Sequence, residues 1–177
     1  PKLLIACDGY LYGGKHLDRL PILRELAAGM PSVTHTLIVP YLDTAPDLSG
    51  LPEPCLFEGA EGDAPLADFV RVGFNDPLYI LYSSGTTGAP KCIVHGVGGV
   101  TLQHAKELRL HSDVRPEDRL FFFTTCGWMM WNWVVSGLMV GTPVILYEGN
   151  PFHSGPDRLW QMAEAERLTH MGVSAKY

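Results

Sequence analysis

The chain has 177 residues, of which 46% are hydrophobic and 18% are charged, and its formal net charge is -6. This length and composition are typical of one globular domain rather than a disordered segment. A negative balance without a basic cluster argues against a nucleic-acid-binding surface. The four cysteines are far apart and include no Cys-x-x-Cys pair, so they indicate neither a zinc site nor a disulfide framework and favour a cytoplasmic location.

The chain opens on a strand-like segment, residues 3–7, with neither an initiator methionine nor a secretory leader, which suggests an internal piece of a longer protein. Residues 120–147 carry no charge and are numerous enough to span a membrane. Asn132, Ser136 and the Gly-Thr-Pro turn at 141–143 interrupt this stretch. We therefore expect buried strands and a buried helix there, and no membrane segment.

Apolar periodicity predicts alternating strands and helices along the chain. Strands at 3–7 and 34–39 flank a helix near 16–28, whose leucines recur at helical spacing. Further strands are expected at 78–81, 92–95, 119–125 and 143–147, and further helices at 97–111, 128–140 and 157–171. This alternation predicts an α/β fold with a mostly parallel, doubly wound sheet flanked by helices.

Residues 43–68 form an acidic segment rich in proline and glycine. No lysine or arginine occurs between Glu25 and Val70, whereas aspartate, glutamate and proline accumulate there. We interpret the segment as a solvated surface connection within the domain.

The segment Tyr82 to Lys91 follows an apolar run and combines hydroxyl side chains, glycines and a lysine. Glycines let the backbone approach a polyanion, hydroxyls donate hydrogen bonds, and lysine supplies a positive charge, so the segment suits phosphate binding. It is not a Walker A loop, because Pro90 precedes Lys91 and Cys92 follows it. A solvated turn without chemistry is the competing interpretation of such a segment.

Three tryptophans, Trp128, Trp131 and Trp133, lie within six positions at a predicted strand-to-helix junction. An aromatic stripe of this kind is typical of a buried core helix. The carboxyl end of a strand is also where a doubly wound sheet places its ligand. We therefore expect Trp128 in the wall of a substrate pocket and Trp133 in the core.

Together these segments resemble the adenylate-forming superfamily, which includes acyl-CoA synthetases and luciferases, and within it the acetoacetyl-CoA synthetase branch. The loop at 82–91 is the superfamily signature, and the Gly-Trp-Met-Met-Trp-Asn-Trp string starting at Gly127 is typical of the branch. The remaining similarity lies in Pro1 to Ile5, Asp8 to Tyr10, Gly14-Lys15, Phe57 to Gly59 and Gly172 to Tyr177. The resemblance implies that residues 1–177 are part of an amino-terminal AMP-binding domain.

Enzymes of this kind join a short acid to CoA through an acyl-adenylate, with ATP and Mg²⁺, and release AMP and pyrophosphate. The resemblance implies that the ATP phosphates are held by Ser83, Ser84, Gly85, Thr86, Thr87, Gly88 and Lys91, and that Lys91 is also catalytic. It places Trp128 in the acid pocket, where Trp128 and Asn132 have the donors to bind a keto oxygen. Lys15 is expected near CoA, although Tyr12 stands where an arginine is expected.

Other functions stay open. Acetyl- or propionyl-CoA synthetase is the competing enzymatic interpretation, and a non-catalytic phosphate-binding module is the competing interpretation of the chain on its own. The family's adenine and ribose segments and its carboxyl-terminal catalytic lysine are expected beyond Tyr177, so we expect the isolated chain to be inactive. The seven histidines have no metal-ligand spacing, and no resident metal site is predicted.

Overall fold

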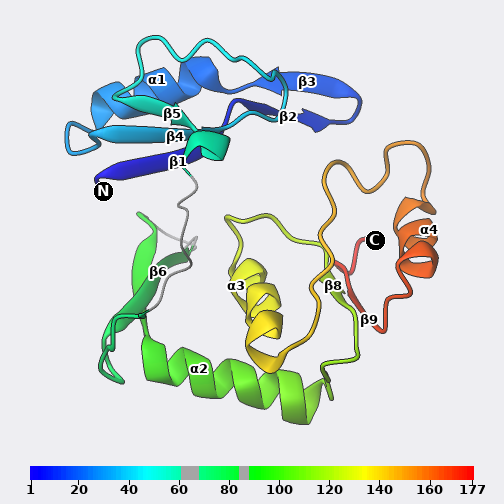
Figure 1. The fold of residues 1–177 in the computed structure, drawn as a ribbon. Helices are drawn as coiled ribbons and strands as arrows, with labels where there is room; N and C mark the ends of the chain where they lie inside the picture. Colours follow the sequence, from blue (N-terminus) through cyan, green and yellow to red (C-terminus); the bar gives the residue numbers. More distant parts are fainter. Residues whose placement is uncertain (61–67, 84–87) are drawn as a thin grey trace. The chain divides into compact units, whose positions relative to one another are not determined.

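The computed structural model of the chain describes residues 1–60, 68–83 and 88–177, and it has an α/β architecture (Figure 1). The chain forms two compact units. Unit 1 comprises Pro1–Ala67 and Glu148–Pro156, and unit 2 comprises Asp68–Tyr147 and Asp157–Tyr177. The chain therefore leaves unit 1, builds most of unit 2, and returns to each unit once.

Unit 1 is built on a three-stranded parallel sheet. The strands are β1 (Leu3–Cys7), β4 (His35–Val39) and β5 (Pro54–Leu56), in the order β1-β4-β5. Helix α1 (Leu20–Gly29) connects β1 to β4 together with a hairpin, and a single 3-10 turn (Phe57–Gly59) follows β5. The parallel pairing of β1 with β4 confirms the βαβ unit predicted from the sequence.

Helix α1 covers one face of this sheet because its apolar residues recur every three or four positions. Leu20, Leu23 and Ala27 are buried and form a core with Ile38 of β4 and with Leu51. The helix begins after Asp18, whose carboxylate Oδ1 accepts the backbone N–H of Leu20 at 2.9 Å. Pro21 occupies the first turn, where its missing N–H costs nothing.

The expected start of this helix at residue 16 was wrong. Residues 15–18 form β3 (Lys15–Asp18), which pairs with β2 (Gly9–Tyr12) in an antiparallel hairpin. Gly13 and Gly14 turn the chain between them with φ angles of 57° and 76°. A side chain is disfavoured at positive φ, so the paired glycines specify a hairpin turn where the leucine spacing alone suggested a helix.

Asp8, at the end of β1, is buried and holds the segment that follows β4. Its carboxylate accepts the backbone N–H groups of Tyr41, Leu42 and Asp43 at 2.7 to 3.0 Å. Burial alone would raise the pKa of Asp8, but these hydrogen bonds outweigh it and lower the pKa below its usual value. Asp8 therefore contributes to the stability of unit 1 as a carboxylate.

Unit 2 begins with an antiparallel hairpin of β6 (Pro77–Ser83) and β7 (Lys91–Gly96). Helix α2 (Val97–Lys106) follows without a break and ends in a wider π-helical turn (Glu107–His111). The remaining elements are β8 (Leu120–Phe122), α3 (Met129–Val135), a 3-10 segment η3 (Ser136–Val140), α4 (Arg158–Ala165) and β9 (His170–Gly172). Strands β8 and β9 pair in parallel.

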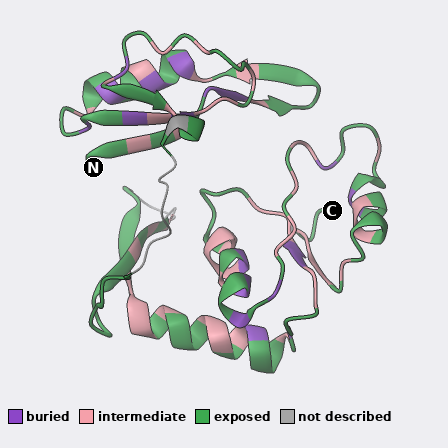
Figure 2. Cartoon of the chain, in the orientation of Figure 1, coloured by how far each residue is buried: buried purple, intermediate pink, exposed green. Residues whose placement is uncertain are grey.

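The core of unit 2 forms where α2, β8 and η3 meet. It contains Leu108, Val114, Leu120 and Val140, with Trp133 of α3 packed against them. Figure 2 shows the buried residues gathered at this junction, whereas the β6–β7 hairpin is mostly exposed. Residues 120–147, the charge-free stretch that was predicted to be buried, thus supply much of this core. None of the helices in the described parts of the chain has the length and apolar character needed to cross a membrane.

Two of the expected elements near the carboxyl end were wrong in extent. The strand expected at 143–147 is reduced to one bridge between Val144 and Leu120. The helix expected at 157–171 ends at Ala165, because Arg167 has a positive φ of 51° that a helix does not permit. His170 to Gly172 instead form β9, which pairs with β8. Glycine suits position 172 because the chain there lies against the ring of Phe122, and a Cβ would approach the ring to 2.1 Å.

Candidate functional site

The β6–β7 hairpin places two predicted phosphate ligands opposite each other. In its register Ser83 pairs with Lys91, so both lie at the end of the hairpin where the two strands meet their connecting loop. Gly88, just before β7, has a φ of 116°, a conformation that glycine adopts without strain. Ser84, Gly85, Thr86 and Thr87 lie outside the described residues, and their expected phosphate contacts stay a prediction.

Lys91 is exposed at this position. None of the ion pairs among the described residues includes it. Ser83, by contrast, is half-buried. An exposed lysine that has no ion pair within the described ranges, beside a strand-end hydroxyl, suits an anionic ligand, because a lysine ammonium has three N–H donors and a full positive charge.

The second predicted site lies at the junction of β8 and α3. Trp128 is the residue before the helix, has extended backbone angles, and leaves 65% of its surface exposed. Its carbonyl accepts the N–H of Trp131 at 3.0 Å. The sequence predicted Trp133 in the core, and this is confirmed, because Trp133 packs on the unit 2 core and its ring makes a T-shaped contact with the ring of Phe122.

Asn132 lies one turn into α3 and is half-buried. Its backbone carbonyl accepts the Ser136 hydroxyl at 2.8 Å, at the point where α3 gives way to the 3-10 segment. The Ser136 oxygen is in turn 2.7 Å from Nδ1 of His104 on α2. Sequence patterns missed this link because a single histidine in a helix has no partner that spacing can identify.

Lys15 lies in unit 1, beside the tip of the β2–β3 hairpin. It is exposed and pairs in register with Tyr12, the residue that replaces an expected arginine. A Cβ at the neighbouring Gly14 would approach the ring of His153 to 3.0 Å, so the hairpin tip packs on the segment that returns to unit 1. The predicted contact of Lys15 with CoA stays a prediction.

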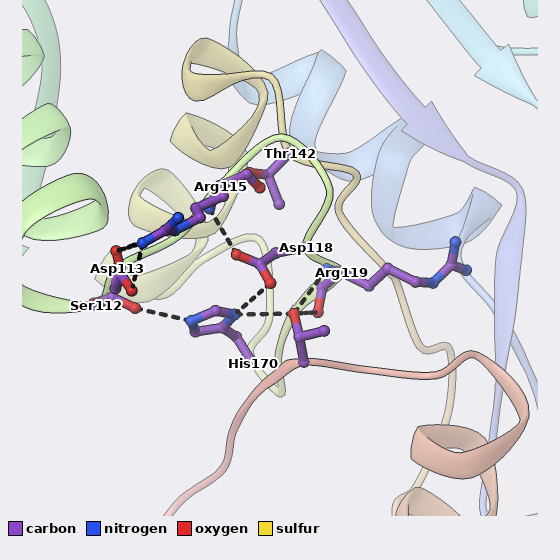
Figure 3. Close-up of polar contacts among 8 residues, drawn as sticks. Ser112, Asp113, Arg115, Asp118, Arg119, Thr142 and His170 are labelled. Carbon is purple, nitrogen blue, oxygen red and sulfur yellow. Dashed lines mark hydrogen bonds and ion pairs between the residues drawn. The ribbon is translucent and has the colours of Figure 1, made fainter.

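A separate polar cluster surrounds the turn between α2 and β8 (Figure 3). Nε2 of His170 donates to the Ser112 carbonyl at 2.8 Å, and Nδ1 lies 3.9 Å from the Asp118 carboxylate. The Asp118 carboxylate accepts the N–H of Arg115 at 2.7 Å, and this bond holds the pKa of Asp118 below its usual value. These contacts close a turn and attach β9 to it, so we assign the cluster a structural role.

The described residues contain no group of three or more histidine, cysteine, aspartate or glutamate side chains able to hold a metal ion. Magnesium usually binds through one or two carboxylates together with the phosphates of its nucleotide. The hydroxyl and lysine chemistry of the hairpin fits a nucleotide that arrives with its own magnesium ion.

Comparison with known proteins identifies the family. A family model described as AMP-binding enzyme matches residues 1–175. The chain belongs to the AMP-binding enzyme family. A protein described as acetoacetyl-coenzyme A synthetase from Rhizobium meliloti (strain 1021) is 48% identical over 188 residues, and the alignment covers the whole of this chain.

A solved structure supports the same relationship. Acetoacetyl-CoA synthetase from Streptomyces lividans superposes with a TM-score of 0.91 at 42% sequence identity, again over the whole chain. A third relative, malonamoyl-CoA synthetase vrtB from Penicillium aethiopicum, is 38% identical over 197 residues. The chain spans 27% of the length of each of these three proteins. The predicted fold class and the predicted resemblance to acetoacetyl-CoA synthetases are thereby confirmed.

Proposed function

We propose that the complete protein joins acetoacetate to CoA in an ATP-dependent reaction through an acyl-adenylate, and that this chain supplies its phosphate-binding hairpin and part of its acid site. The observation that carries the proposal is the pairing of Ser83 with Lys91 at the loop end of the hairpin, in a chain of the AMP-binding family. Its substrates are small molecules, namely a short acid, ATP and CoA. Cys55, Cys92 and Cys126 are exposed free thiols, which supports a cytoplasmic reaction.

The role of the hairpin follows from the charge that the first step develops. The carboxylate of the acid attacks the α-phosphorus of ATP, the bond to the β-phosphate oxygen breaks, and pyrophosphate leaves. The Lys91 ammonium and the Ser83 hydroxyl donate to phosphate oxygens and stabilise the departing negative charge. Bound magnesium would neutralise further phosphate charge.

The acid site is proposed at the start of α3. An exposed indole at Trp128 would limit the length of the acid, which suits one of four carbons. Acetoacetate also has a keto oxygen that requires a hydrogen-bond donor, and both the Trp128 N–H and the Asn132 amide are donors. Lys15 would meet an anionic group of CoA, a role that its exposed ammonium supports.

Malonamoyl-CoA synthetase is the second candidate function. The fungal relative is named for an acid with an amide in place of the methyl ketone, and it matches the whole of this chain. An amide both donates and accepts, whereas a ketone only accepts. Acetyl- or propionyl-CoA synthetase is a third alternative, in which the acid is shorter and its group beyond the carboxylate is apolar.

The test is an acid panel with the complete protein, ATP, Mg²⁺ and CoA, in which AMP and thioester are both quantified. We expect acetoacetate to give the highest kcat/KM, ahead of malonamate, acetate and propionate. A higher kcat/KM with malonamate or acetate would replace the proposed acid, and no thioester with any acid would refute the proposed function.

A further inference from the structure

Strand β7 and helix α2 are continuous in unit 2, so the hairpin with Lys91 and the helix with His104 form one piece. Strand β7 ends at Gly96 and α2 begins at Val97. The ring of His95 also packs on Tyr79 of β6, with centroids 5.2 Å apart. Helix α2 therefore starts directly from the hairpin that contains Lys91.

His104 connects this piece to the helix of the proposed acid site. Its Nδ1 lies 2.7 Å from the Ser136 oxygen, and the Ser136 hydroxyl reaches the Asn132 carbonyl at 2.8 Å. A serine hydroxyl has a single hydrogen, which the bond to Asn132 uses, so the Nδ1–H of His104 is the donor to Ser136. The chain of hydrogen bonds runs from α2 to the backbone of Asn132.

The other side of this helix end is held by packing. A Cβ at Gly137 would lie 2.9 Å from the Leu120 side chain and 3.2 Å from Val144. The backbone at Gly137 therefore lies close to Leu120 of β8. On the other side, the hydrogen bond from His104 attaches the neighbouring Ser136 to α2. Burial lowers the pKa of His104, and a positive charge on His95 lowers it further against the opposing effect of Glu107.

We propose that His104 is a positioning residue that, through Ser136, holds α3 in place and so sets the geometry of the acid site at Trp128 and Asn132. The inference rests on the proposed function, since it concerns the acid that the same site takes. A purely structural role would change stability alone, whereas a positioning role changes the KM for the acid.

Substitutions of His104 and Ser136 in the complete protein test this role. His104→Leu removes the donor, Ser136→Ala removes its acceptor, and His104→Asn places an amide N–H close to the position of Nδ1. We expect the first two to raise the KM for acetoacetate about three- to tenfold, the effect of one neutral hydrogen bond, and to leave the KM for ATP unchanged. His104→Asn should restore the wild-type KM, and the double variant should be no worse than either single variant.

Arg109 provides the matched control. Its Nη2 donates to the Val140 carbonyl at 2.9 Å, so it joins the π-helical turn after α2 to the last residue of η3 and makes no contact with Ser136 or Asn132 in that bond. Arg109→Gln should lower the thermal midpoint without raising the KM for the acid. Equal effects of Arg109→Gln and His104→Leu on this KM would overturn the proposal, because both would then act through stability.

Two further outcomes are decisive. If folded His104→Leu and Ser136→Ala proteins keep the wild-type KM for acetoacetate, His104 has no positioning role. If His104→Leu does not fold, the KM of Ser136→Ala, which loses a single oxygen, decides the matter. A wild-type protein inactive with every acid would refute the proposed function, whereas an active wild type with unchanged variants overturns this inference alone.

Discussion

Lys91 makes no ion pair among the described residues, and its predicted role is the stabilisation of departing pyrophosphate. In the complete protein, Lys91→Ala should slow adenylate formation by roughly 30- to 1,000-fold, the effect of losing one charge-assisted contact of about 2 to 4 kcal/mol in a transition state. The thioester-forming half-reaction, started from synthetic acyl-adenylate, should change far less. Lys106→Ala is the control, because Lys106 pairs with Glu107 on the surface of α2. Wild-type rates of pyrophosphate release in Lys91→Ala would contradict the hairpin assignment.

Trp128 and Trp133 offer a second comparison at the residue scale. Trp128 is largely exposed, so Trp128→Ala should leave the thermal midpoint close to wild type and raise kcat/KM for acids of five to eight carbons. Trp133→Ala, which removes a core indole, should instead destabilise the protein by roughly 3 kcal/mol or more. An unchanged acid profile in Trp128→Ala would show that this indole does not limit the acid.

Asp8 links protonation to stability. Its pKa is lowered in the folded state, so its stabilising effect is complete above the usual carboxyl pKa and is lost as the pH falls through the lower, folded value. Asp8→Asn should cost roughly 2 kcal/mol at pH 7, since an amide nitrogen would face backbone N–H groups. The difference in urea midpoint between the two proteins should shrink below about pH 4. Asp68→Asn, at an exposed position, is the control, and a pH-independent difference would contradict the assignment.

At the scale of elements, two adjacent glycines in α2 have opposite expected effects. A Cβ at Gly98 would lie 2.1 Å from the Phe74 ring, whereas a Cβ at Gly99 meets nothing within 4 Å. Gly99→Ala should stabilise the helix by about 0.5 to 1 kcal/mol, because alanine has the higher helix propensity. Gly98→Ala should destabilise the protein by about 1 to 3 kcal/mol through overpacking. Urea midpoints of the two variants check both signs, and stabilisation by Gly98→Ala would show that Phe74 moves freely.

The elements that sequence patterns predicted correctly are those whose signal is local. Strand 3–7 was predicted with its observed bounds, and the expected helix at 97–111 is α2 with its π-helical turn. Its last turn widens so that the N–H of Ser112 reaches the Glu107 carbonyl, a detail that periodicity does not encode. The strand at 170–172 was missed because its apolar character is weak and its partner, β8, lies about 50 positions earlier in the chain.

The candidate site also contains residues with a local sequence signal and residues that distant contacts bring together. Ser83 and Lys91 were singled out by their residue types and by the family resemblance. The hairpin pairs them in register, and their phosphate contact stays a prediction. The contact of His104 with Ser136 joins residues 32 positions apart on different helices. No spacing rule covers such a pair, because it is set by the packing of α2 on the 3-10 segment.

At the scale of the whole molecule, we expect the 177 residues alone to bind ATP weakly and to form no AMP or thioester. The proposed phosphate contact of Lys91 comes from an exposed lysine, whose attraction for phosphate is screened by salt. Equilibrium dialysis at low and high salt measures the binding, and a coupled AMP assay with acetoacetate, CoA and Mg²⁺ measures turnover. AMP above the level of a Lys91→Ala chain would show that these residues hold a complete active site.

The return of residues 148–156 to unit 1 has a consequence for synthesis on the ribosome. Segment 148–156 of unit 1 is translated only after residues 68–147, the larger segment of unit 2. Domains that are continuous in sequence fold as they emerge, amino-terminal first. In this chain the β2–β3 hairpin packs at Gly14 against His153, and this contact can form only after His153 has been translated. Residues 1–67 expressed alone should therefore be more open to protease than the same residues in the 177-residue chain.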